Sequence, residues 1–262
     1  MHNTSTPQVP TRNIPIYEIR IAVSAIETLT PHQRYTFYLL GHIFNELMCL
    51  QKLICFASPG HCDSRPIRKL PETAQAFFLI RVAACKVWEA KKALKHKKTR
   101  IVLEASVLPH MTEGQKRFEG LLSTIEDAGW IGKMRNQFGF HYPCFTQWER
   151  VTTPTKEWID DSIFGSERSG NTFYASSEAV AREWFFRQSD MIKPHFTVES
   201  MIDMMVDVLK NMNRFLEDVI AVYIADVLHV DTYQDAGEIS GFDFESITIP
   251  FWTHLSKETL IK

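Results

Sequence analysis

Residues 197–228 read TVESMIDMMVDVLKNMNRFLEDVIAVYIADVL and carry a strict helical pattern of apolar side chains. These side chains recur at alternating spacings of three and four residues over three heptads, at Ile202, Met205, Leu209, Met212, Leu216, Val219 and Tyr223. The spacing aligns them along one narrow face of an α-helix. Because Thr197 is suited to cap its start, we predict one long helix that packs antiparallel against another helix or in a dimer.

Helical periodicity also runs through the residues that precede this segment. A helix over residues 31–57 is expected because Thr30 can cap its start and Pro31 suits its first turn. Further helices are predicted over about residues 71–96, 112–126, 130–140 and 177–188. Thr112 and Ser177 are suited to cap the second and the fourth of these.

Residues 144–176 differ from the helical segments. Ile163-Phe164 and Thr172-Phe173-Tyr174 flank a run of glycine, serine and charged residues, which is typical of a small β-hairpin near residues 162–175. The fold class predicted is therefore mainly all-α: a helical bundle of five or six helices with a small β-hairpin insertion.

The length of 262 residues suits one large domain with short appendages. Residues 1–15 are polar and proline-containing, and we expect a disordered leader without an export signal. Residues 16–228 are expected to form a single helical-bundle domain, with the hairpin inserted at about 144–176. Residues 229–262 are expected to form an acidic C-terminal extension that packs on the bundle.

The composition supports a packed core and excludes several classes of protein. Hydrophobic residues make up 45% of the chain and aromatic residues 12%, far from a disordered composition. No apolar run approaches the length of a membrane span. The five cysteines form no CxxC pair, and an odd count without an export signal favours reduced thiols in a cytoplasmic protein. The sequence contains no phosphate loop, dinucleotide fingerprint or metalloprotease helix, so we expect neither a cofactor nor a metal.

The two halves of the chain carry opposite charge. Residues 1–150 hold 20 Lys and Arg against 12 Asp and Glu, a balance of +8, whereas residues 151–262 hold 9 against 19, a balance of −10. A basic half is the electrostatic feature expected for a polyanionic partner. Attraction between the two halves, within one chain or across a dimer, explains the same pattern equally well.

A dense group of basic residues ends the helix predicted over residues 71–96. The candidates for nucleic-acid binding in this group are Lys91, Lys92, Lys95, Lys97, Lys98 and Arg100. A solvated helix end is the alternative, since the helix dipole favours cations at a C-terminus.

The segment RNQFGFHY, residues 135–142, is the best candidate for a site. Five residues separate Arg135 from His141, and the polar Asn136 directly follows the arginine. These features resemble the signature of the HEPN superfamily, in which an arginine and a histidine stand four to six residues apart, frequently with a polar residue after the arginine. The resemblance covers about residues 130–143 and their helical context.

HEPN-superfamily proteins are compact helical bundles, often homodimeric, and many are metal-independent endoribonucleases of toxin–antitoxin and phage-defence systems. The resemblance therefore implies a homodimeric RNA-binding protein that cleaves RNA, with an antitoxin or another defence protein as a partner. Residue by residue, it implies that Arg135 is the phosphate clamp, His141 the acid or base, and Asn136 the group that orients the phosphate or the imidazole.

These residue types suit RNA cleavage without a metal. An imidazole titrates near neutral pH and can exchange protons with the ribose hydroxyl or the leaving oxygen. A guanidinium offers several donors to the charge that develops on the phosphate. On an ideal straight helix, however, Arg135 and His141 lie about 120° apart. A shared site therefore needs two chains whose motifs face each other, or a bend at Gly139.

The same residues also allow a purely structural interpretation. Arg135 can pair with an acidic residue, for which Glu46 is one candidate, and His141 can cap a helix C-terminus. The protein would then be a non-enzymatic helical protein that binds a nucleotide, a nucleic acid or a protein partner.

Overall fold

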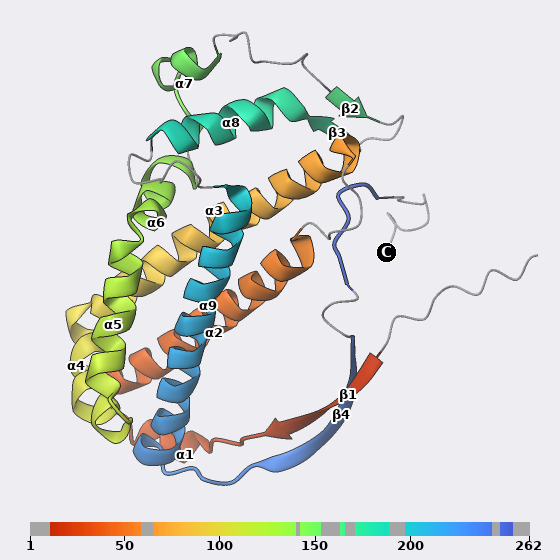
Figure 1. The fold of residues 1–262 in the computed structure, drawn as a ribbon. Helices are drawn as coiled ribbons and strands as arrows, with labels where there is room; N and C mark the ends of the chain where they lie inside the picture. Colours follow the sequence, from red (N-terminus) through yellow and green to blue (C-terminus); the bar gives the residue numbers. More distant parts are fainter. Residues whose placement is uncertain are drawn as a thin grey trace, which may run out of the picture.

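The computed structural model describes residues 11–58, 65–139, 142–152, 163–165, 171–188, 197–242 and 247–253. Within these ranges, six α-helices have ten or more residues: α2 (Pro31–Ala57), α3 (Pro66–Lys95), α4 (Lys97–Ser106), α5 (Gly114–Asp127), α8 (Ala175–Gln188) and α9 (Val198–Val222) (Figure 1). Shorter helices are α1 (Val23–Glu27), α6 (Gly129–Lys133) and α7 (Phe145–Thr152), with a 3-10 turn, η1 (Leu108–His110), and π-helical turns η2 (Met134–Phe138) and η3 (Tyr223–Val227). The predicted mainly α-helical bundle is confirmed.

Helix α9 crosses α2 and α3 and packs against both (Figure 1). All seven apolar residues of its predicted seam are buried. The Tyr223 hydroxyl donates to the Gln33 carbonyl at 2.8 Å, and Asn213 Nδ2 donates to Gln51 Oε1 at 2.6 Å. The end of α9 therefore meets the start of α2, so the two helices are antiparallel and the seam is an interface within one chain.

Helix α2 begins where its cap predicts. The Thr30 hydroxyl accepts from the Gln33 amide at 3.3 Å, and the Gln33 side chain accepts from the Thr30 amide at 3.0 Å, which is a capping box. Thr197 forms the same arrangement at the start of α9. The other two predicted caps are wrong. Helix α5 begins after Glu113, whose φ of 52° sets it apart from Thr112, and α8 begins at Ala175, so Ser177 lies inside the helix.

Helix α3 begins at Pro66, five residues earlier than the start predicted at Pro71. A proline inside a helix has no N–H for the carbonyl four residues before it, which here is that of Ile67. The indole N–H of Trp252 donates to this carbonyl instead, at 2.8 Å. The Ile249 amide donates to the Phe56 carbonyl at the end of α2, also at 2.8 Å. The extended residues 247–253 thus satisfy carbonyls of both helices.

Two pairs of strands accompany the helices in the described part of the chain. Strand β2 (Ile163–Gly165) pairs antiparallel with β3 (Thr172–Tyr174), which confirms the strands of the predicted hairpin. Strand β1 (Thr11–Glu18) pairs antiparallel with β4 (Gln234–Phe242) and forms a ribbon on the outside of the bundle (Figure 1). Residues 11–15 therefore do not belong to a disordered leader, while residues 1–10 lie outside the described ranges. Eight of the nine residues of β4 are exposed, so this part of the acidic extension contacts β1 rather than the bundle.

The outer side of α2 is unusually apolar. Among the described helices, α2 alone is long and apolar enough to cross a membrane, a property that core helices share. Only 22% of its most apolar window is buried. Tyr35, Tyr38 and Leu53 are exposed on this helix among polar residues such as His42 and Asn45, so part of its apolar surface lies beyond the packing on α3 and α9.

The caps give a direct test of the helix starts. We expect Thr30→Ala to lower the free energy of unfolding by about 1 kcal/mol, because the hydroxyl that satisfies the Gln33 amide is lost. The matched control Thr112→Ala changes it by less than about 0.5 kcal/mol, since the Thr112 side chain caps no helix. Urea denaturation followed by circular dichroism measures both. Equal losses in the two variants would contradict these helix starts.

Candidate functional site

Arg135 and Asn136 lie in η2, directly after α6. The Gly139 amide donates to the Met134 carbonyl at 2.8 Å, a bond across five residues that makes this turn π-helical. Such turns are rare and frequently mark functional sites. The ideal-helix offset between Arg135 and His141 does not apply to this segment, because its turn is wider than an α-helical one. Phe140 and His141 lie outside the described residues.

The backbone of Gly139 itself is helical, with φ of −69° and ψ of −44°. The bend that would re-aim His141 concerns residues outside the described ranges. The glycine is needed for a close approach: a Cβ at this position would overlap the Sγ atom of Cys85, which is buried in α3. Helix α3 therefore fixes the position of the segment that carries Arg135.

The guanidinium of Arg135 is held from two sides. Its Nε donates to Glu89 Oε1 at 2.8 Å, and its Nη1 donates to Asn136 Oδ1 at 3.1 Å. The suggested pairing of Arg135 with Glu46 is wrong, because Glu46 pairs with Lys86 at 2.6 Å across α2 and α3. The side chain of Arg135 remains 38% exposed. Within the described residues its second Nη has no partner, so donors remain for a ligand.

The electrostatics keep this arrangement charged. Burial tends to raise the pKa of Glu89, but hydrogen bonds from Lys92 and Arg135 outweigh it and hold the pKa below its ordinary value. Burial raises the pKa of the Cys85 thiol, against the attraction of Arg135 and Arg81 on either side. Cys85 is therefore a neutral packing residue between two arginines.

Arg81, Cys85 and Glu89 stand four residues apart on α3 and share one face of it. Arg81 is thus about 12 Å along the helix from the carboxylate that holds Arg135. Sequence reasoning missed Arg81 and the pairing of Glu89 with Arg135. The available signal was a charged stripe at helical spacing within an otherwise apolar stretch of the predicted helix.

Two hollows adjoin this face of α3. The α2–α3 groove has a volume of about 310 Å³, and its lining includes His42, Ile43, Glu46, Lys86, Glu89 and Ala90. The aromatic pocket has a volume of about 530 Å³, and its lining includes Phe78, Arg81, Phe138, Trp148, Glu178 and Trp184. Gly139 and Tyr142, the described residues that flank positions 140 and 141, also line the aromatic pocket.

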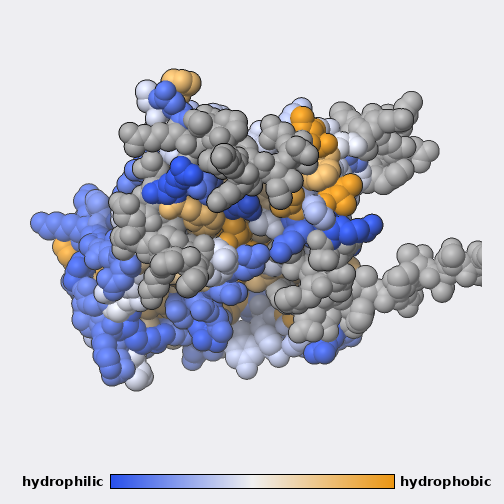
Figure 2. All heavy atoms as spheres, turned by 45° about the horizontal axis from the view of Figure 1, so that its top comes forward, coloured by the Kyte–Doolittle hydropathy of each residue, from blue (hydrophilic) through white to orange (hydrophobic). Residues whose placement is uncertain are grey.

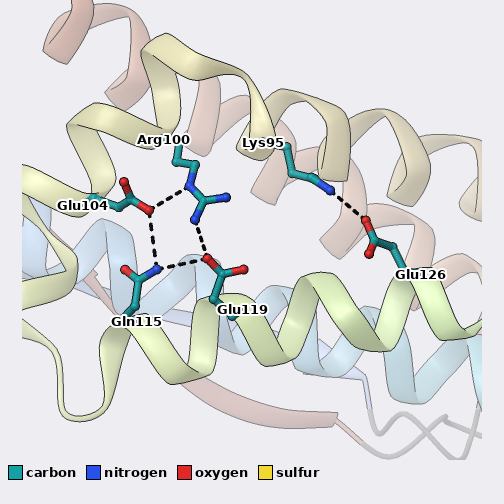
Figure 3. A network of polar contacts seen from close by, with 6 residues as sticks. All are labelled: Lys95, Arg100, Glu104, Gln115, Glu119 and Glu126. Carbon is teal, nitrogen blue, oxygen red and sulfur yellow. Dashed lines mark hydrogen bonds and ion pairs between the residues drawn. The ribbon is translucent and has the colours of Figure 1, made fainter.

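The six basic residues proposed for nucleic-acid binding are largely used within the chain. Lys91 and Lys95 both pair with Glu126, at 3.0 and 2.8 Å, and hold its pKa near 2. Lys92 pairs with Glu89 at 3.1 Å. Figure 3 shows Lys95 of α3 and Arg100 of α4 in contact with Glu126 and Glu119 of α5.

Arg100 donates to Glu104 at 2.7 Å and to Glu119 at 2.5 Å. Lys97 and Lys98 are exposed, and within the described ranges neither has an ion-pair partner. Four of the six basic side chains therefore form ion pairs within the chain, and three of these side chains join α3 and α4 to α5. A single ion pair between described residues, Arg117 with Asp218, joins the basic half of the chain to the acidic half.

Comparison with protein families, with curated proteins and with solved structures finds no match for this chain. The likeness to the HEPN superfamily therefore remains a resemblance of the motif at residues 135–141 and of its helical context. Among the described residues, no group of three His, Cys, Asp or Glu side chains is placed to hold a metal ion.

The contact between Gly139 and Cys85 can be tested by a double-mutant cycle. We expect Gly139→Ala to lower the free energy of unfolding by about 1–3 kcal/mol, because the added methyl overlaps the Cys85 sulfur. In a Cys85→Ala background the same change becomes neutral or stabilising, since alanine is favoured over glycine in helical backbone. Chemical denaturation of the four proteins measures the coupling. Additive effects would show that the two residues do not touch.

Proposed function

We propose that this chain is an RNA-binding protein that cleaves RNA without a metal. Arg135 is the phosphate clamp, His141 the proton donor or acceptor, and Asn136 the residue that positions the guanidinium. One observation carries the proposal: a half-exposed arginine is held at a π-helical turn by Glu89 and Asn136 and keeps donors unpaired by described residues. A positioned guanidinium of this kind is suited to a phosphate.

The chemistry follows from these residue types. The ribose 2′-oxygen attacks the phosphorus, the bond to the 5′-oxygen breaks, and a cyclic phosphate and a 5′-hydroxyl result. The imidazole of His141 takes the proton of the 2′-hydroxyl or returns one to the leaving oxygen. The guanidinium of Arg135 stabilises the charge on the phosphate oxygens. Glu89 accepts a hydrogen bond from Nε of Arg135 and so orients the guanidinium, while other donors of the guanidinium remain for the phosphate.

We further propose a homodimer formed through the outer side of α2. This side exposes Tyr35, Tyr38 and Leu53 among polar residues, and the α2–α3 groove lies along it. The rim of the groove carries both signs of charge, at Glu46 and Lys86, which suits contact with a second copy of the same surface. Glu89 lines the groove and binds Arg135, so the dimer would place both arginines at the edge of one interface. The protein would act in the cytoplasm, with an antitoxin or another defence protein as its partner.

RNA cleavage in the presence of EDTA tests the activity. We expect the wild-type protein to cleave RNA, Arg135→Ala to be slower by about 10²–10³-fold, and His141→Ala to be slower by about 10²–10⁴-fold. Arg135→Lys recovers little, because an ammonium cannot replace the fork of donors. Product analysis should give cyclic phosphate ends.

Two variants serve as matched controls for this assay. Arg187→Ala removes an exposed arginine paired with Glu183, and His110→Ala removes an exposed histidine far from the motif in sequence. Both should cleave at the wild-type rate. Cleavage that survives Arg135→Ala and His141→Ala, or no cleavage by any of the proteins, would rule out the proposed activity.

The dimer predicts a solution mass twice the 30.3 kDa of one chain. Tyr38→Arg places a charge on the exposed side of α2 and should yield monomers, whereas Tyr174→Arg, at an equally exposed tyrosine of β3, should not. Light scattering after size exclusion measures each mass. A monomeric wild-type protein at micromolar concentration would exclude a composite site.

A second candidate function is favoured by the basic cluster. Since Lys91, Lys92, Lys95 and Arg100 are paired within the chain, the basic half offers less free charge to RNA than its composition indicates. This favours a non-enzymatic helical protein that binds a protein partner or a nucleotide. Absence of cleavage in the assay above would favour this candidate.

A further inference from the structure

The aromatic pocket lies between α3, η2, α7 and α8. Its volume of about 530 Å³ is within the range of small-molecule sites in proteins. In Figure 2 the side of the molecule that carries α7 and α8 is turned forward, and hydrophobic residues are visible there among hydrophilic ones. The rings of Phe138 and Trp184 pack with centroids 4.2 Å apart, and Trp148 lies 6.4 Å from Trp184.

Unpaired hydrogen-bond donors gather at this pocket. Seven buried side-chain nitrogen or oxygen atoms in the described part of the chain have no hydrogen-bond partner. Three of them are N–H groups of residues that line the aromatic pocket: Arg81 Nε, Trp148 Nε1 and Trp184 Nε1. These three atoms have almost no accessible surface, so they do not face the open space of the pocket. The donors that a ligand can reach are the terminal nitrogens of Arg81, which have no partner among the described residues.

The charged residues of the pocket narrow the choice of ligand. The guanidinium of Arg81 lies 5.5 Å from the ring centroids of both Phe77 and Phe78, and no ion pair holds it among the described residues. Glu178 brings a carboxylate to the same pocket. A ligand that fits must therefore be flat, offer acceptors to Arg81 and offer donors to Glu178.

We propose that the aromatic pocket binds one unstacked guanine base. Bases removed from a stack pack on aromatic rings and bond through their edges. Guanine presents O6 and N7 as a pair of acceptors that matches a guanidinium. Its N1–H and amino group donate, and a carboxylate such as that of Glu178 accepts from them. Phe78, which is 54% exposed, provides a ring on which the base can stack.

The position of the pocket connects it with Arg135. Arg81 lies about 12 Å along α3 from Glu89, the residue whose carboxylate binds Arg135. A phosphate at Arg135 and a base at Arg81 can therefore belong to neighbouring nucleotides of one strand. This placement rests on the proposed RNA function, whereas binding of a free nucleotide does not.

Calorimetric titration of the full chain with guanosine, adenosine, cytidine and uridine monophosphates tests the pocket. We expect saturable binding of the guanosine nucleotide, at least about tenfold tighter than that of the other three. Arg81→Ala should weaken it by about tenfold or more, and Glu178→Gln should reduce the preference for guanine. The control Arg214→Ala, an exposed arginine of α9 outside the pocket, should bind as the wild type does.

The outcomes separate this inference from the proposed function. Selective binding of the guanosine nucleotide without RNA cleavage would support the pocket and contradict the proposed function. Should Arg81→Ala fail to fold, the reduced preference for guanine in Glu178→Gln decides the matter, since that change replaces a carboxylate by an amide of nearly the same shape. Equal binding of all four nucleotides, or binding of none, would overturn the guanine pocket whether or not the protein cleaves RNA.

Discussion

The burial of the apolar face of α9 against α2 and α3 is the interaction on which the rest of the structure depends. It removes seven regularly spaced side chains from water, which is worth about 1.5–3 kcal/mol for each large one. The antiparallel direction of α9 relative to α2 is set by the hydrogen bond that the Tyr223 hydroxyl donates to the Gln33 carbonyl. With α3 held in this way, one face of that helix remains for Arg81, Cys85 and Glu89, and this face supports η2 through Gly139. The packing of the core therefore determines where the residues of the candidate site lie.

The charges of the chain illustrate how composition and structure can differ. The basic first half suggested a surface for a polyanion, yet Glu126, Glu104 and Glu119 occupy most of the cluster at the end of α3 and the start of α4. The low pKa of Glu126 reflects this pairing. Arg135 and Arg81, which keep donors unpaired by described residues next to a groove or pocket, come from positions where the sequence shows no concentration of charge. For this fold, the position of a cation is more informative than the net charge of its half of the chain.

Much of the bundle could be predicted because its signals are local. The start of α2 follows from Thr30 and Pro31, and the buried face of α9 follows from its spacing. The pairing of β1 with β4 could not be predicted, because both strands are largely exposed and lack a buried alternating face. At the site, the motif and its place at a helix end could be predicted, but not the partner of Arg135. Glu46 and Glu89 are equally plausible from spacing, and the packing of η2 on α3 decides between them.

The contact between Trp252 and the Ile67 carbonyl has a consequence for the order of events during synthesis. Residues 66 and 71 leave the ribosome long before residue 252 does, so water is the partner of the Ile67 carbonyl when the first turns of α3 form. The later arrival of Trp252 replaces this water by a protein donor. The contact therefore joins the last described residues of the chain to the first turn of a helix that was made much earlier.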